Sequence, residues 1–226
     1  MFCTLNEKKG KGKFSMIGFY SYTVILTYLS AVSSVIGMTF VMNGKIKYAI
    51  FCLMFSGAFD LFDGKIARTK KNRTEHEKTF GIQIDSLCDI VCFCMFPAMI
   101  NFYVSNHTCE IYSMITSSAI VVAGIIRLGF FNVMEQDRQK ETSENRKMYR
   151  GLPVTSVAVI LPLIYLSRNF FVDKFSEDIY NIIFSSIVLL VSFLFIFDFK
   201  VKKPNNKEVI YLLLFAVLII LGLIFL

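Results

Sequence analysis

Long apolar segments separated by short basic blocks constrain the fold of this chain more than any other feature. Seven such segments can be read, over 18–42, 48–62, 82–104, 111–134, 154–171, 179–199 and 209–226. A helix that crosses a bilayer needs roughly 20 apolar residues, and these segments are close to that length. With 55% hydrophobic residues in 226, the chain is too apolar for an ordinary soluble domain. The sequence therefore predicts an all-α, polytopic membrane bundle.

The length of the chain allows one membrane domain, residues 1–226, and leaves no room for several. Residues 1–16 are polar and basic and read as a cytosolic tail, while 207–226 form a C-terminal helix additional to the first six. The net charge of +7 falls in blocks between apolar segments rather than along one amphipathic face. That distribution is typical of topology determinants and argues against a nucleic acid partner.

Lys and Arg residues predict how the chain is oriented. With the amino terminus inside, nineteen of them fall on the cytosolic side and four on the opposite side, which is a clear positive-inside bias. We therefore expect an integral membrane protein, in the plasma membrane of a bacterium, with its carboxyl terminus outside. Residues between the second and third apolar segments would then face the cytosol.

Four aspartates stand at the edges of the second and third apolar segments. Asp60 and Asp63 are three residues apart, and Asp85 and Asp89 are four apart, so on helices each pair occupies one face. Four carboxylates this near to lipid repel one another and lose hydration, which requires compensating cations. An all-oxygen ligand set of this kind suits Mg²⁺ or Mn²⁺.

Residues next to these aspartates fit a phosphate-bearing ligand. Gly64 removes a side chain where a ligand could approach closely, and Arg68, one turn further on, offers a fork of donors to phosphate. Cys88, Cys92 and Cys94 could instead form a soft-metal site. We interpret them as small packing residues, because no His stands nearby and the aspartates prefer hard cations.

The spacing resembles the signature of the CDP-alcohol phosphatidyltransferases, Asp-x-x-Asp-Gly-x-x-Ala-Arg followed by Gly-x-x-x-Asp-x-x-x-Asp. All signature positions are occupied, by Asp60, Asp63, Gly64, Ala67, Arg68, Gly81, Asp85 and Asp89. The connection from Arg68 to Gly81 is longer than is usual in the family, and we expect the surplus to form a longer surface loop within 69–80.

The resemblance implies roles for these residues. The four aspartates would hold two divalent ions, Mg²⁺ or Mn²⁺, on the diphosphate of CDP-diacylglycerol. Asp89 would also act as the general base that takes the proton of the acceptor alcohol. The remaining contacts to CDP-diacylglycerol would come from Gly64, Arg68 and Gly81.

Further residues resemble the phosphatidylserine synthase branch of the family: Asp85-Ser-Leu, Arg127-Leu-x-x-Phe-Asn132 and Gly151-Leu-Pro-Val. That branch implies transfer of the phosphatidyl group to L-serine, with Arg127 and Asn132 as acceptor contacts. An intramembrane Arg usually faces a cavity or a carboxylate, but Arg127 could also be structurally paired or reach the membrane surface.

Alternatives remain open at this point. Glycerol 3-phosphate or an inositol phosphate could replace serine as the acceptor in the same chemistry. A divalent-cation transporter could also use four carboxylates, although such proteins more often show broken helices in two repeated halves. The expected partners are CDP-diacylglycerol, L-serine and membrane lipids, with a homodimer as an open alternative.

Overall fold

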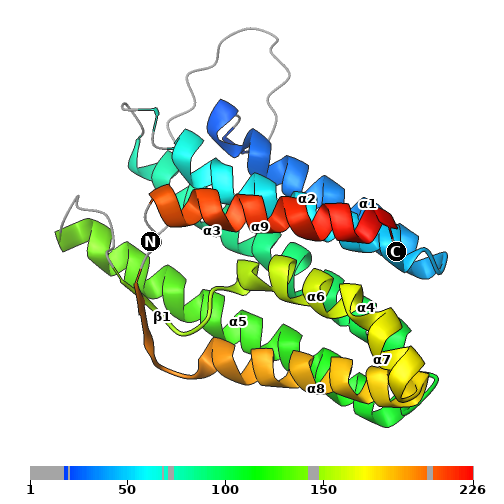
Figure 1. Ribbon diagram of the computed structural model, residues 1–226. Helices are drawn as coiled ribbons and strands as arrows, with labels where there is room; N and C mark the ends of the chain where they lie inside the picture. The colour runs from blue at the N-terminus through cyan, green and yellow to red at the C-terminus, as the bar shows by residue number, and fades with distance from the viewer. Residues whose placement is uncertain are drawn as a thin grey trace, which may run out of the picture.

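The computed structural model describes residues 18–19, 21–67, 69–70, 74–141, 148–202 and 206–225. Its long helices run side by side in one bundle, with their axes roughly parallel or antiparallel (Figure 1). The predicted all-α membrane bundle is confirmed. The predicted cytosolic tail, 1–16, lies outside the described residues.

Short helical turns precede α1 and α6, and a third one lies between α3 and α4. The first half of the chain forms η1 (Tyr22–Val24), α1 (Ile25–Met42), α2 (Ile46–Ala67), α3 (Glu75–Ile90), η2 (Val91–Met95) and α4 (Phe96–Ser105). The second half forms α5 (Glu110–Glu141), β1 (Met148–Arg150), η3 (Val154–Ser156), α6 (Val157–Leu166), α7 (Arg168–Lys174), α8 (Glu177–Ile196), β2 (Lys200–Lys202) and α9 (Asn206–Phe225).

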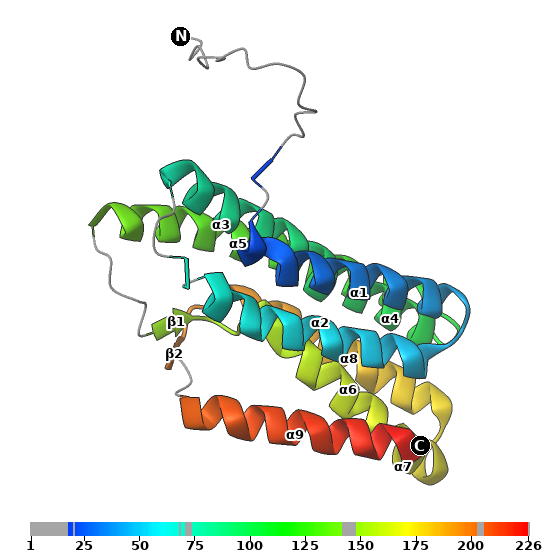
Figure 2. The same ribbon diagram turned by 90° about the horizontal axis from the view of Figure 1, so that it is seen from above.

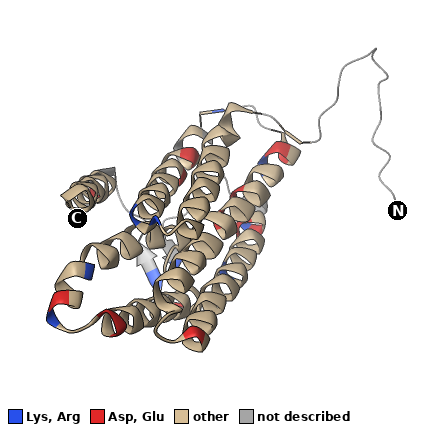
Figure 3. Ribbon diagram, turned by 90° about the vertical axis from the view of Figure 1, so that its right-hand side faces the viewer, with Lys and Arg blue, Asp and Glu red and all other residues tan. Residues whose placement is uncertain are grey.

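Six helical stretches among the described residues are long and apolar enough to cross a membrane. They are Tyr22–Met42, Glu75–Ser105, Glu110–Arg138, Val154–Lys174, Glu177–Ile196 and Glu208–Phe225. Most positions along the helices are neither acidic nor basic (Figure 3). α2 has 22 residues, enough to span, but carries Lys47, Asp60 and Asp63. The chain is an integral membrane protein.

Small polar residues join α1 to α2. The hydroxyl groups of Ser34 and Ser56 lie 2.7 Å apart, and the Ser56 hydroxyl donates to the carbonyl of Ser30 at 2.8 Å. All three residues are buried. Small side chains let membrane helices approach closely and satisfy one another's polar groups. This contact fixes α1 against the helix that carries Asp60 and Asp63.

A buried asparagine joins α4, α5 and α8. The Asn101 amide nitrogen donates to Thr116 at 2.9 Å and to Ser117 at 2.8 Å, both on α5. Its amide oxygen accepts from Ser185 of α8 at 2.9 Å. Because Asn101 is completely buried, these bonds satisfy a side chain that would otherwise be costly inside a membrane.

The predicted surface loop over 69–80 is wrong for residues 75–80, which form the start of α3. The Thr74 hydroxyl accepts from the backbone N–H of Glu77, and the Glu77 carboxylate accepts from the backbone N–H of Thr74. This capping box satisfies two of the N–H groups that a helix start leaves free. Residues 75–80 of the connection therefore belong to α3.

Two smaller features complete the bundle. β1 and β2 pair antiparallel, with Tyr149 opposite Val201, an element that the sequence analysis did not predict. α9 lies at the edge of the bundle beside α6 (Figure 2). Its Gly222 faces Leu166 of α6, so that a Cβ added there would lie 3.0 Å from a Leu166 methyl carbon.

Candidate active site

Three carboxylates from two helices converge in the structure. Asp60 lies in the second half of α2, while Asp85 and Asp89 lie on one face of α3. One carboxylate oxygen from each of the three lies within 4.8 Å of the other two, and the side chains are half-buried. Carboxylates at this separation repel strongly in a medium of low dielectric, so the cluster favours a bound cation. The all-oxygen donor set fits Mg²⁺ or Mn²⁺.

The fourth predicted carboxylate, Asp63, is held from α1. Its side chain is 8% exposed, and the Thr27 hydroxyl donates a hydrogen bond of 3.0 Å to its Oδ2. Asp63 also lies beside Asp85. The structure therefore brings all four predicted carboxylates together, with three helices positioning them. The sequence analysis missed Thr27, because no spacing rule relates a hydroxyl to a carboxylate 36 positions further along the chain.

The helix that carries Asp85 and Asp89 changes its winding just beyond the site. η2 is a π-helical turn directly after Ile90, with Cys92, Phe93 and Cys94 completely buried inside it. A π-helical turn accommodates one extra residue, and such turns are frequent at functional sites. Here it changes which side chains of the span face the interior after Asp89. The burial of Cys92 and Cys94 also confirms that they pack between helices.

The predicted contacts to a nucleotide lie around the cluster. Gly64 follows Asp63 on α2, and a Cβ built at this position would meet no described atom within 4 Å apart from its chain neighbours and the backbone of its own helix. The space beside Gly64 is therefore open to a ligand. Gly81 lies one turn before Asp85 on α3. Arg68 falls outside the described residues.

Asn132 of α5 contacts α3 at the residue next to Asp85. The Ser86 hydroxyl donates to the Asn132 Oδ1 at 2.7 Å, and Ser86 is the neighbour of Asp85 in the sequence. Asn132 is half-buried. The contact places a polar side chain of α5 close to the helix that carries two of the carboxylates.

Arg127 points to a different side of α5. Asn132 is five positions further along the chain, which corresponds to about 140° around a helix with 3.6 residues per turn. Its Nη1 donates to the carbonyl of Phe195 at 3.0 Å and its Nη2 to the carbonyl of Gly151 at 3.4 Å. The guanidinium also lies 4.6 Å from the centre of the Phe131 ring. Arg127 therefore binds one carbonyl in the last turn of α8, where a positive charge is favourable, and a second one at Gly151, before α6.

Gly151 allows this arrangement. Its φ is +65°, in the region that favours glycine, and a Cβ there would lie 2.6 Å from Nη1 of Arg127. Its N–H donates to the carbonyl of Phe199 at 2.7 Å, and the N–H of Leu152 donates to the carbonyl of Leu194 at 3.1 Å. The predicted Gly151-Leu-Pro-Val segment thus ties the start of α6 to the end of α8.

The segment before α1 holds the connection between α2 and α3. The Phe19 and Phe80 rings lie 5.4 Å apart, and the Tyr22 hydroxyl lies 3.0 Å from Oγ1 of Thr69. Lys70 pairs with Glu77 at 2.8 Å, and both side chains are largely shielded from solvent. These contacts fix the approach to the carboxylate cluster from the side where α2 ends and α3 begins.

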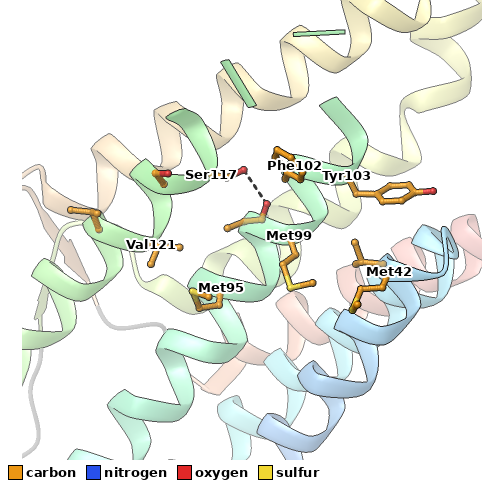
Figure 4. A pocket seen from close by; sticks show the side chains of 11 residues that line it. Met42, Met95, Met99, Phe102, Tyr103, Ser117 and Val121 are labelled. Atoms are coloured by element: carbon orange, nitrogen blue, oxygen red, sulfur yellow. Dashed lines mark hydrogen bonds between the residues drawn. The ribbon is translucent and has the colours of Figure 1, made fainter. Parts of the chain in front are cut away.

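An apolar groove of about 520 Å³ lies elsewhere, between α1, α4 and α5. Met42, Met95 and Met99 line it, and Ser117 donates to the carbonyl of Ala98 at its edge (Figure 4). None of the four aspartates belongs to its lining. Its lining suits hydrocarbon, whereas the chemistry-bearing side chains belong to the carboxylate cluster.

Comparison with the sequences of known proteins shows which family this chain resembles. A chain from Helicobacter pylori, CDP-diacylglycerol–serine O-phosphatidyltransferase, is 26% identical over 208 residues, covering 91% of this chain and 82% of its own length. The enzyme of the same name from Saccharomyces cerevisiae is 32% identical over 154 residues, covering 66% of this chain. The chain spans about half, 54%, of the length of that yeast relative.

A third relative comes from an archaeon. The archaetidylserine synthase of Methanothermobacter thermautotrophicus is 27% identical over 163 residues, covering 72% of this chain and 63% of its own length. The CDP-alcohol phosphatidyltransferase family model matches residues 22–197, from η1 to just past α8. That range is well over half of the chain and contains all four aspartates. The chain therefore belongs to the CDP-alcohol phosphatidyltransferase family.

Proposed function

We propose that this protein transfers the phosphatidyl group of CDP-diacylglycerol to the hydroxyl of L-serine, giving phosphatidylserine and CMP. The observation that carries the proposal is the convergence of Asp60, Asp85 and Asp89 within a membrane-embedded helix pair. A lipid substrate can keep its acyl chains in the bilayer while its nucleotide and a polar acceptor arrive from water. The names of the bacterial and yeast relatives support serine as the acceptor.

The four aspartates would hold two divalent cations, Mg²⁺ or Mn²⁺. Bound there, such ions neutralise the negative charge that develops as a phosphoanhydride bond breaks. The fit is chemical: oxygen atoms of Asp60, Asp85 and Asp89 meet, and Asp63, which lies beside Asp85, accepts a hydrogen bond from the Thr27 hydroxyl. Because the chain belongs to the CDP-alcohol phosphatidyltransferase family, we propose an enzyme and not a divalent-cation transporter.

The residues have separate tasks in the transfer. The serine oxygen attacks the phosphorus atom that carries diacylglycerol, and the bond from that phosphorus to the CMP oxygen breaks. The proton of the serine hydroxyl passes to the carboxylate of Asp89, which acts as general base. We assign Gly64, Gly81 and Arg68 to CDP-diacylglycerol, with the open space beside Gly64 as the approach of the nucleotide.

Asn132 and Arg127 are the proposed acceptor contacts. Asn132 is supported by its bond to Ser86, the neighbour of Asp85. Arg127 has five N–H donors, and the two bonds to carbonyls leave others for the serine carboxylate. We place the site at the cytosolic face of a bacterial plasma membrane, on the positive-inside distribution of Lys and Arg. α9 would then be an addition to a single phosphatidyltransferase domain.

An acceptor panel tests the serine assignment. Purified protein is supplied with labelled CDP-diacylglycerol and, in turn, L-serine, glycerol 3-phosphate and an inositol phosphate. We expect serine to give labelled phosphatidylserine and CMP while the phosphorylated acceptors give little product, because they call for additional cations around the acceptor. Preference for a phosphorylated acceptor would overturn the assignment and leave the family chemistry intact.

Substitution of Arg127 by Lys tests its role in holding serine. The Lys variant keeps the charge but loses the two parallel donors that grip a carboxylate. We expect the KM for serine to rise more than the KM for CDP-diacylglycerol, with a loss of about 1.5–3 kcal/mol in kcat/KM for serine. Initial rates at varied serine and fixed, saturating CDP-diacylglycerol measure the change.

The Gly151→Ala variant provides the matched control for Arg127→Lys. Its added Cβ disturbs the same contact with Nη1 and the positive φ, but the guanidinium stays. If Gly151→Ala raises the serine KM as much as Arg127→Lys does, Arg127 acts by holding the end of α8 and not by binding serine. An unchanged serine KM in the Lys variant removes Arg127 from the acceptor site.

A further inference from the structure

Thr27 provides a contact that neither the signature nor the proposed reaction assigns. We propose that Thr27 positions Asp63 so that only one of its carboxylate oxygens is offered to a divalent cation, which favours Mg²⁺ and Mn²⁺ over Ca²⁺ at the carboxylate cluster. This inference rests on the proposed metal site and concerns its selectivity. Thr27 is a positioning residue, because it acts through Asp63.

The hydrogen bond between Thr27 and Asp63 is buried and directed to one atom. Thr27 Oγ1 lies 3.0 Å from Oδ2 of Asp63, and the two residues are 6% and 8% exposed. A hydrogen bond to a charged group is stronger than one between neutral groups, and water has little access to replace it here. Oδ2 is therefore held on the α1 side. The Asp63 carboxylate also contacts the side chain of Asp85, a member of the cluster, and the backbone N–H of Gly64, and we assign its other oxygen to the cation.

Contacts on both sides of Thr27 hold this part of the chain in place. On the interior side, Ser34 of α1 bonds to Ser56 of α2 at 2.7 Å. On the surface side, the chain before Thr27 is held by the contact between Tyr22 and Thr69 at 3.0 Å. Thr also populates mainly two χ1 rotamers in a helix, which limits where its hydroxyl can lie. The Thr27 hydroxyl is therefore held in place and orients the Asp63 carboxylate through its hydrogen bond.

Coordination chemistry connects this orientation to ion choice. Mg²⁺ demands near-octahedral geometry and takes single oxygens from carboxylates, whereas Ca²⁺ takes 6–8 oxygens and commonly binds a carboxylate through both. A carboxylate with one oxygen committed to a hydroxyl donor is a poor bidentate ligand. Removing the Thr27 hydroxyl frees Oδ2 and allows Asp63 to rotate, which should weaken Mn²⁺ binding and strengthen Ca²⁺ relative to it.

Binding of Mn²⁺ to the full-length protein in detergent tests the proposal without measuring turnover. The electron paramagnetic resonance signal of free Mn²⁺ gives the Kd, and titration with CaCl₂ gives the Ca²⁺ concentration that displaces half of the bound Mn²⁺. For Thr27→Val we expect the Mn²⁺ Kd to rise about 10–100-fold, as for other residues that orient metal ligands. The ratio of Ca²⁺ to Mn²⁺ affinity should rise as well. Thr27→Ser, which keeps the donor, should resemble the unmodified protein in both measurements.

Ser34→Ala is the matched control, because it removes a buried hydroxyl from the same helix without touching a carboxylate. It should leave the Mn²⁺ Kd and the ion preference unchanged. Should Thr27→Val not fold, Thr27→Ala is measured in its place. The proposal is overturned if removal of the hydroxyl leaves both quantities unchanged, or if Ser34→Ala shifts them equally. If the unmodified protein binds no Mn²⁺, the proposed metal site fails, which is a separate result.

Discussion

Purified protein that has been freed of divalent cations with EDTA should show no phosphatidyl transfer, and added Mg²⁺ or Mn²⁺ should restore it. The reason is the convergence of Asp60, Asp85 and Asp89, whose oxygens lie within 4.8 Å of one another. A diphosphate bears further negative charge, so it cannot approach this cluster unless positive ions intervene. The release of labelled CMP, measured before and after addition of the metal, gives the effect.

EDTA saturated with Mg²⁺ controls for effects of the chelator itself and should leave the rate unchanged. Asp60→Asn is the informative variant, because it removes one of the three repelling charges. We expect it to melt at a higher temperature than the unmodified protein when both are free of metal, and to gain less stability when Mg²⁺ is added. Full turnover in metal-free buffer would contradict the metal requirement.

Much of the fold could be predicted because it depends on local composition. Apolar segments of bilayer length read directly as helices, and the spacing of Asp85 and Asp89 places them on one face whatever the packing. The start of α3 was readable too, since Thr74 and Glu77 form a capping-box pattern. The prediction of a loop followed the polar composition of residues 69–80 and did not use the capping-box pattern.

Contacts between distant segments could not be predicted in this way. Nothing in the sequence relates Thr27 to Asp63 or Arg127 to the carbonyl of Phe195, because these bonds depend on how α1, α2, α5 and α8 pack. The orientation of Arg127 illustrates the limit. Its intramembrane charge was visible in the sequence, but the carbonyls of Phe195 and Gly151 that accept its hydrogen bonds were not.

The family chemistry could be predicted from the sequence more firmly than the acceptor. The eight signature residues define a family and its chemistry because their types and offsets are demanding together. Serine as the acceptor depends on fewer and less specific residues, and Asn132 and Arg127 lie on different sides of α5. For that reason the acceptor is the part of the proposal that most needs direct measurement.

Asp89→Asn should lower the rate of transfer by about 10²–10⁴-fold, the range typical of a lost general base. Asn keeps the size and shape of the side chain and can still offer one oxygen, but it cannot take the proton of the serine hydroxyl. At 25 °C this loss corresponds to about 2.7–5.5 kcal/mol in the activation barrier. Single-turnover release of labelled CMP at saturating serine measures it.

Because Asp89 is also a proposed metal ligand, the Mn²⁺ Kd and the affinity for CDP-diacylglycerol are measured on the same Asp89→Asn preparation. Loss of rate at concentrations that saturate both ligands assigns the effect to proton transfer, whereas a loss that disappears at saturation assigns it to binding. Asp173→Asn removes an exposed carboxylate from α7 and controls for the change in net charge. If Asp89→Asn retains half of the turnover when saturated, Asp89 is not the base, and the proton must leave by another route.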